Sequence, residues 1–176
     1  MSDSLILLDS VTASSSATVT LGTTDWDSSY DVYMVVFSDV VTATDDIKMH
    51  MRFNKASDNS ADSSSNYDIA EMTVKTYSAF EENADTDDDK FILMGQELGT
   101  GTSETANGVM YLFNFNNASE YSFFTMEMTC LDDSAHLHGA QGGGVLTVAQ
   151  ATNGVNFFMA SGNIASGEFK LYGLNK

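Results

Sequence analysis

The chain has 176 residues, of which 25 are Asp or Glu and only 7 are Lys or Arg, so its formal net charge at pH 7 is -18. So few cations cannot neutralise a row of phosphates, and the acidic field repels anionic membrane surfaces, which argues against nucleic-acid and membrane partners. Hydrophobic residues make up 43% of the chain and aromatic residues 11%, whereas acidic disordered chains are poor in both. The length suits a single domain that spans residues 1–176.

Apolar and polar residues alternate along most of the chain, with the period of two that is typical of a half-buried β-strand. The clearest stretch is residues 47–53, IKMHMRF, in which every odd position is apolar. In chain order, the expected strands are residues 5–8, 17–21, 31–37, 47–53, 67–77, 90–94, 109–115, 121–131, 135–138, 145–150, 155–160 and 168–172. No segment of ten residues or more carries an apolar stripe at helical spacing. The pattern predicts an all-β protein, an antiparallel β-sandwich.

Three polar stretches interrupt this pattern. Residues 55–66 are mostly Ser, Asp, Asn and Ala, residues 80–90 are mostly acidic, and residues 95–107 are rich in Gly, Thr and Ser. Each stretch lies between two expected strands, so we interpret all three as long loops within the domain. We expect the acidic residues of 58–62 and 81–89 to point towards solvent.

The N-terminal segment bears on where the protein works. Residues 1–4 are acidic and precede a run of only four apolar residues, Leu5, Ile6, Leu7 and Leu8. A secretory signal peptide has a basic start and a longer apolar run, so none is expected, and the single Cys130 cannot form an internal disulfide. We favour the apolar run as the first strand of the domain, and the alternative is a docking strand or arm within residues 1–10 that pairs with a neighbouring subunit.

His136 and His138 form a His-x-His pair, which would place both rings on one face of a strand. With His50 as a third ligand, the pair could bind zinc or another transition metal. The alternative is two polar residues on the wet face of a strand that buries Leu137, and we expect this arrangement because the spacing is common. We therefore predict neither a metal site nor a cofactor.

Two further runs resemble ligand-binding loops only superficially. Asp85, Asp87 and Asp89 offer carboxylates at alternate positions, but the Gly and the distant Glu of a calcium loop are missing. Residues 139–144, GAQGGG, are followed by a strand-like segment, whereas a phosphate loop is followed by a helix and carries a Lys. We expect a solvated acidic loop tip and a flexible hairpin connection.

No catalytic constellation stands out. The chain has three His, no Gly-x-Ser-x-Gly motif and no Cys-His spacing that points to an activated thiol. Carboxylates are so numerous that no pair is marked as a general acid and base. We predict that the protein is not an enzyme.

Trp26, Tyr30 and Tyr33 are the aromatic residues that best suit a ligand site. On a loop they could form a platform on which a sugar ring stacks, and equally they could anchor the segment that leads into the following strand. A carbohydrate-binding or receptor-binding module, with a host surface glycan as its ligand, is therefore the alternative function.

Two segments resemble a family of small virion proteins of tailed bacteriophages, especially marine ones. Residues 25–37, DWDSSYDVYMVVF, together with residues 47–53, are similar to a loop, a Tyr-Asp-x-Tyr strand and an apolar-x-apolar-Arg-apolar strand. Residues 161–174, SGNIASGEFKLYGL, are similar to the closing Gly-x-x-x-Leu-Tyr-Gly strand of such proteins.

The resemblance implies a jelly-roll-like fold and a non-enzymatic role in a capsid decoration (cement), tail fibre or head fibre. The implied location is the virion, and the implied partners are other virion proteins of the capsid or tail. We also expect a homo-oligomer, with a trimer as one form. A high negative charge agrees with a protein that stays soluble at high copy number before assembly.

Overall fold

The computed structural model describes residues 5–174, except for the side chains of residues 94–96. The strands are β1 (Leu5–Ser16), β2 (Thr18–Gly22), β3 (Val32–Thr42), β4 (Ile47–Lys55), β5 (Tyr67–Lys75), β6 (Glu81–Asp88), β7 (Phe91–Leu98), β8 (Ala106–Phe113), β9 (Ser122–Leu131), β10 (Leu137–Leu146), β11 (Thr152–Met159) and β12 (Ile164–Leu174). One 3₁₀ turn, η1 (Thr23–Asp25), follows β2, and residues 5–174 contain no α-helix. The predicted all-β class is confirmed. No helix in this part of the chain is long and apolar enough to cross a membrane.

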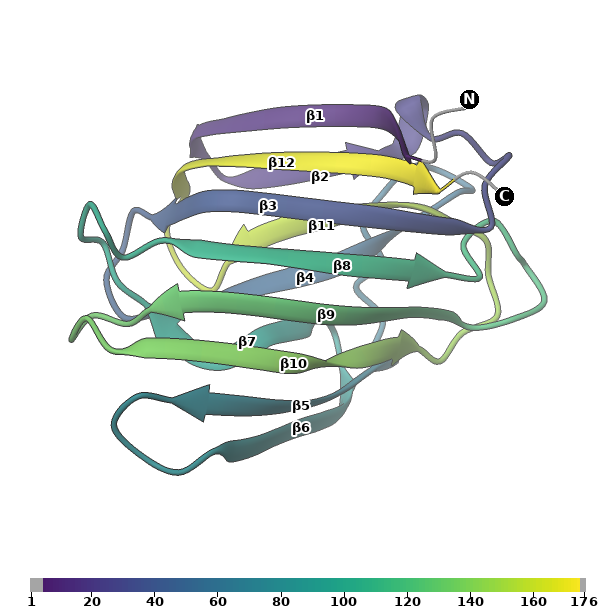
Figure 1. The fold of residues 1–176 in the computed structure, drawn as a ribbon. Helices are drawn as coiled ribbons and strands as arrows, with labels where there is room; N and C mark the ends of the chain where they lie inside the picture. The colour runs from purple at the N-terminus through teal and green to yellow at the C-terminus, as the bar shows by residue number, and fades with distance from the viewer. Residues whose placement is uncertain (1–4, 175–176) are drawn as a thin grey trace.

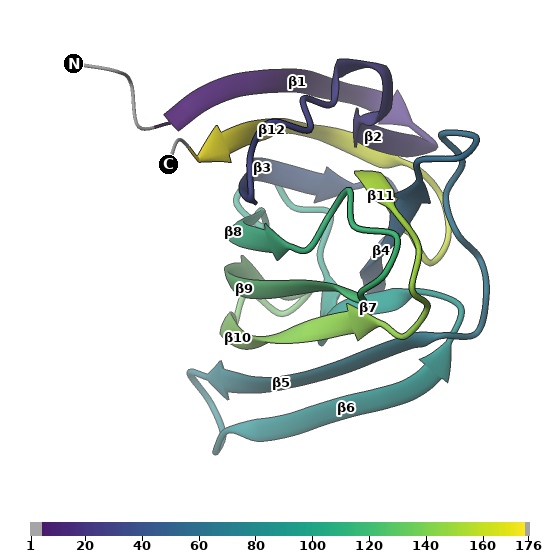
Figure 2. The same ribbon diagram turned by 90° about the vertical axis from the view of Figure 1, so that its right-hand side faces the viewer.

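The strands form two antiparallel sheets that pack face to face (Figure 1). The large sheet has eight strands in the order β1-β12-β3-β8-β9-β10-β5-β6, and the small sheet has four in the order β2-β11-β4-β7. Figure 2, turned by a right angle, shows β11 and β4 in a second layer beside β3, β8 and β9. The structure is therefore the β-sandwich that the alternating pattern predicts.

Eight of the strands have the order of a jelly roll, which confirms that expectation as well. Without β5, β6, β9 and β10, the sheets read β1-β12-β3-β8 and β2-β11-β4-β7. Numbered afresh along the chain, these orders are 1-8-3-6 and 2-7-4-5, which two interleaved Greek keys produce. The remaining pairs, β5–β6 and β9–β10, are insertions that widen the large sheet beyond β8.

The core between the sheets is rich in aromatic side chains. Phe53 of the small sheet lies with its ring centroid 5.0 Å from Phe91, 4.8 Å from Phe115 and 6.2 Å from Phe124. The hydroxyl of the buried Tyr67 accepts a hydrogen bond from the backbone N–H of Phe53 at 3.2 Å. Because these rings come from both layers, they join the two sheets across the sandwich.

The glycine-rich run is part of a strand, so the predicted hairpin connection is wrong. Strand β10 includes all of residues 139–144 and is hydrogen-bonded to β9 on one side and β5 on the other. A Cβ at Gly142 would collide with the backbone of β5 at Ala70, and one at Gly143 with the backbone of β9 at Phe124. Glycine is needed here because two neighbouring backbones approach closely.

The acidic segment that we expected as a loop is strand β6. It pairs with β5 and forms one edge of the large sheet, with most of its side chains exposed. Its carboxylates therefore lie along an open edge, where charge prevents pairing with a foreign strand. The loop predicted at residues 95–107 is shorter than expected, because β7 ends at Leu98 and β8 begins at Ala106. Residues 56–66 form the predicted long loop, with a single bridge from Ala61 to Asn54.

Candidate functional site

The outer face of the large sheet carries apolar side chains where a water-facing antiparallel sheet normally carries polar ones. Outward residues of adjacent strands stand opposite one another, so they form rows across the sheet. One row is Leu7, Tyr172, Met34, Tyr111, Thr125, Gly143 and Ala70. The next row is Ser10, Lys170, Val36, Val109, Glu127, Gln141 and Met72. The first row crosses seven strands without a charge, in a chain whose net charge is -18. We call these rows and their outward neighbours the outer face.

Most of the exposed large hydrophobic side chains of the described residues gather on the outer face. Those on the face are Leu5, Leu7, Met72, Val74, Tyr111, Phe123 and Leu137, with exposed fractions between 38% and 53%. The others are Tyr77, Phe80 and Tyr121. Contiguous apolar surface of this kind marks a binding site for another molecule.

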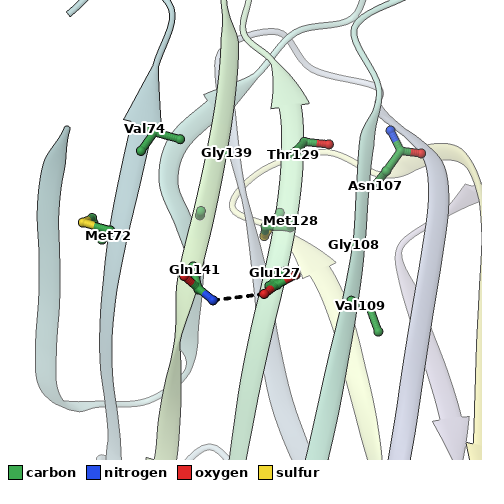
Figure 3. Close-up of a pocket in the computed structure, with 11 residues that line it drawn as sticks. Met72, Val74, Asn107, Gly108, Val109, Glu127, Met128, Thr129, Gly139 and Gln141 are labelled. Carbon is green, nitrogen blue, oxygen red and sulfur yellow. Dashed lines mark hydrogen bonds between the residues drawn. The ribbon is translucent and has the colours of Figure 1, made fainter. Parts of the chain in front are cut away.

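Glycines of β10 open a hollow in the outer face. Figure 3 shows Gly139 between Val74 of β5 and Thr129 of β9, where no side chain fills the space. The hollow measures about 460 Å³, and Glu127 is its only charged lining residue. The side-chain amide of Gln141 donates a hydrogen bond to Oε1 of Glu127 at 3.0 Å across its lower end (Figure 3). The outer face therefore combines projecting apolar side chains with a recess.

Sequence reasoning missed the outer face, although the sequence holds a signal for it. Residues 32–37, VYMVVF, and 109–113, VMYLF, are continuously apolar rather than alternating. Such runs are typical of strands that are covered on both faces. In the structure the two runs are neighbours in the middle of the large sheet, and only the inward face of each is covered.

The histidine pair lies at the end of the β9–β10 hairpin and binds a carboxylate. Oδ2 of Asp132 lies 2.9 Å from Nε2 of His138 and 3.2 Å from Nδ1 of His136. Burial alone would raise the pKa of Asp132, but hydrogen bonds from the backbone N–H of His136 and from both rings lower that pKa to about 2. His138 is fully buried and Leu137 is exposed, so the predicted orientation is wrong. The hairpin register turns His138 inward, and the Asp132 contact compensates its burial.

The third histidine lies on the other sheet. His50 of β4 packs edge-on against Phe158, with ring centroids 5.3 Å apart. Burial, together with the positive charges of Lys90 and Arg52, lowers the pKa of His50 to about 4. Among the described residues, no three His, Cys, Asp or Glu side chains are placed to hold a metal ion. The structure thus does not bring the three histidines together.

His138 also belongs to a Cys-His-Asp cluster that the residue spacing did not reveal. Cys130 is the cross-strand partner of His138, and both residues are buried. Burial, with the nearby charge of Asp132, raises the pKa of the Cys130 thiol to about 12. A nucleophilic cysteine needs a lowered pKa and access to substrate, so this thiol is not suited to catalysis.

The three candidate stacking aromatics are packed against the protein to different degrees. Tyr33 is fully buried and accepts a hydrogen bond from the Asn116 amide at 2.8 Å. The ring of Trp26 lies 3.9 Å from that of Tyr33, and its Nε1 donates to Oδ1 of Asn116 at 2.6 Å. This geometry favours the anchoring interpretation for both residues, and Tyr33 has no free ring face for a ligand. Tyr30 is half-buried and borders an open polar hollow.

The predicted acidic surfaces are only partly solvent-facing. Asp62 is buried, where its carboxylate accepts hydrogen bonds from the backbone of Ser64 and the amide of Gln150. The expectation that residues 58–62 all point outward is therefore wrong at Asp62, because loop residues cap this carboxylate. Asp89 contacts Arg52 and Lys90, so it is not left to share a cation with Asp85 or Asp87.

The apolar run near the N-terminus is the beginning of β1. Leu5, Ile6 and Leu7 pair with the end of β12, and Leu8 packs partly against the core. Residues 1–4 lie outside the described residues. The run is thus the first strand of the sandwich, and since β1 is an edge strand, docking of another chain along its free side stays a prediction.

Comparison with protein families, curated proteins and solved structures finds no match. The resemblance to virion proteins therefore rests on its two segments. In the structure, β3 holds the end of residues 25–37 and pairs with β12, which lies within residues 161–174, so these two stretches form part of the outer face. Residues 47–53 belong to β4 and lie on the small sheet.

Proposed function

We propose that this protein is a non-enzymatic structural subunit of a tailed-phage virion, and that it binds other virion subunits through the outer face. In this role it is a jelly-roll subunit on the particle surface, as a capsid decoration (cement) or as part of a tail or head fibre. The observation that carries the proposal is the outer face, which is apolar and poor in charge on a strongly acidic molecule. The assignment to a virion rests on the resemblance of the two segments to phage virion proteins.

The composition of the outer face supports binding to protein. The central parts of protein interfaces are depleted in charge and enriched in aromatic residues and Met. The outer face offers Tyr111, Phe123 and Met72 as exposed side chains of these types. Strand β6 and several loops carry dense carboxylates that oppose non-specific contact, whereas the nearly uncharged outer face permits close approach of another subunit.

Analysis of purified particles tests the proposal. Mass spectrometry should detect the chain in virions, and electron microscopy should place it on the particle surface. In a complementation assay, Tyr111→Glu should reduce its copy number per particle, because it puts a carboxylate into the uncharged row. Ser57→Glu, which adds the same charge to an exposed loop, is the matched control. Absence of the chain from purified virions contradicts the proposal.

Carbohydrate binding is a second candidate, which the hollow beside Tyr30 favours. Its lining includes Asp31, Asn114 and Asn117, and polar groups around one aromatic ring suit a sugar. Glycan-array binding that Tyr30→Ala abolishes supports this function. Binding that survives Tyr30→Ala removes this hollow as the site.

A further inference from the structure

We propose that the outer face binds the same face of a second copy of this chain, in a two-fold dimer. The inference rests on the proposed function, in which this face binds other subunits, and it names the subunit. The area of the outer face, its shape and its charge all favour this pairing.

The outer face is large enough for a stable dimer. Five neighbouring strands, β3, β8, β9, β10 and β5, contribute to its central part. The strands lie ~4.8 Å apart, and about seven residues of each strand contribute, at ~3.3 Å per residue along the strand. The central part therefore covers roughly 550 Å² per copy. Two copies then bury about 1,100 Å², above the ~1,000 Å² that a specific interface needs, and β12 and β1 extend the face further.

The shape of the outer face is self-complementary. A two-fold interface brings identical patches together, so the patch must carry both projections and recesses. Met72, Tyr111 and Phe123 project from it, whereas Gly139 and Gly142 floor two adjoining hollows. Facing sheets pack about 10 Å apart with interdigitating side chains, which needs this alternation of large and absent side chains.

The charge of the molecule restricts the partner. A second copy brings the same net charge of -18, so it can approach closely only where the surface is nearly neutral. Lys170 and Glu127 are the only charged residues of the two central rows, and Gln141 hydrogen-bonds the latter. Within these rows a basic partner finds only the carboxylate of Glu127, and the next carboxylate along the second row is Glu82 of the edge strand β6, opposite Met72. The face therefore suits its own copy better than a cationic protein.

Sedimentation equilibrium of the full chain tests the proposal. The wild type should form dimers, and Val74→Glu should raise the dimer dissociation constant at least about tenfold, since each dimer gains two opposed carboxylates in an apolar interface. Phe80→Glu is the matched control, because it makes the same change at an exposed apolar residue in the turn between β5 and β6. Circular dichroism checks that both variants are folded. A dimer that Val74→Glu leaves unchanged overturns the proposal.

Cysteine labelling locates the contact independently. The native Cys130 is buried, so a thiol reagent should report on an introduced cysteine. Thr125→Cys, in the uncharged row, should react more slowly as protein concentration rises, whereas Ser57→Cys should react at a constant rate. Equal behaviour of the two variants contradicts a dimer through the outer face.

The outcomes separate this inference from the proposed function. A chain that stays monomeric at all concentrations, but whose Thr125→Cys is protected in assembled particles, has another virion protein on this face. That result overturns the dimer and leaves the virion role intact. If the chain forms the expected dimer but is absent from purified virions, the virion role is overturned and the dimer stands.

Discussion

Burial sets the charge state of individual side chains in this protein. His50 is 7% exposed and lies beside an aromatic ring and two cations, so its neutral form is favoured. Asp132, by contrast, stays ionised because its hydrogen bonds outweigh the cost of its burial. Burial has opposite outcomes because Asp132 accepts several hydrogen bonds in its charged form, whereas Asp88 and Asp89 only partly offset the burial of His50.

The pKa of His50 predicts a loss of stability in mild acid. In the unfolded chain this histidine titrates near its ordinary value of 6.5, and in the folded protein near 4. Above pH 6.5 both states are neutral and the contribution is complete. As the pH falls towards 4 the unfolded state takes up the proton first, so stability is lost. Urea unfolding across this range should show a shallower pH dependence for His50→Gln than for the wild type, and equal slopes contradict the assignment.

Two glycines of β10, three residues apart, should respond differently to substitution by alanine. Gly142→Ala should destabilise the protein by about 2 kcal/mol or more, because its Cβ meets the rigid backbone of β5. Gly139→Ala should change stability by less than about 1 kcal/mol, since its closest neighbour is a methyl group of Val74 at 3.2 Å and the unfolded chain loses entropy. Denaturant unfolding of both variants measures the difference. Equal effects would mean that β10 does not lie as close to β5 as described.

At the scale of elements, the two edges of the large sheet differ. Strand β6 lines one edge with carboxylates, whereas β1 carries Asp9 as its only charged residue. Charge on an edge strand prevents pairing with another sheet, so the β6 edge is closed to association. The hydrogen-bonding edge open to a neighbour is therefore that of β1.

Neutralising the β6 edge should expose its protective role. Glu82→Thr combined with Asp85→Thr keeps strand-forming side chains but removes two edge charges, so aggregation during refolding should increase. Light scattering during refolding measures this. Asp25→Thr with Glu120→Thr removes the same charge from exposed positions outside the strands and is the control. If both double variants aggregate alike, net charge rather than edge protection is responsible.

At the scale of the whole molecule, the net charge of -18 opposes every self-association. Association must therefore bury apolar surface and keep the contact centred away from the acidic edge strand β6, whose Glu82 lies opposite Met72 at the border of the outer face. The insertions β5–β6 and β9–β10 are what make this possible, because they widen the large sheet beyond the eight jelly-roll strands.

We predict that added salt strengthens association, up to about the ionic strength of seawater. Salt shortens the screening length from about 10 Å at 0.1 M to about 3 Å at 1 M, which removes repulsion between copies and leaves apolar contact intact. Sedimentation across a salt series checks this. Dissociation at high salt would show that ion pairs hold the interface.

Those parts of the fold whose signal is local can be predicted from the sequence. Residues 47–53 and 121–131 alternate apolar and polar side chains, and they are β4 and β9 with the predicted faces buried. Alternation reports which side of a strand is covered, so about a dozen such segments already define a sandwich.

The features that depend on neighbouring strands could not be predicted in this way. Strand β6 is polar and the middle of β10, residues 139–144, is glycine-rich, so neither stretch has a local strand pattern, and both pair with β5. Of the candidate site, the sequence singled out Leu5 and Leu7, but the rest of the outer face appears only when β3, β8, β9 and β10 lie side by side. A pattern along one strand records the burial of its own faces. The strand order, which brings distant segments into one surface, is set by contacts between residues far apart in the chain.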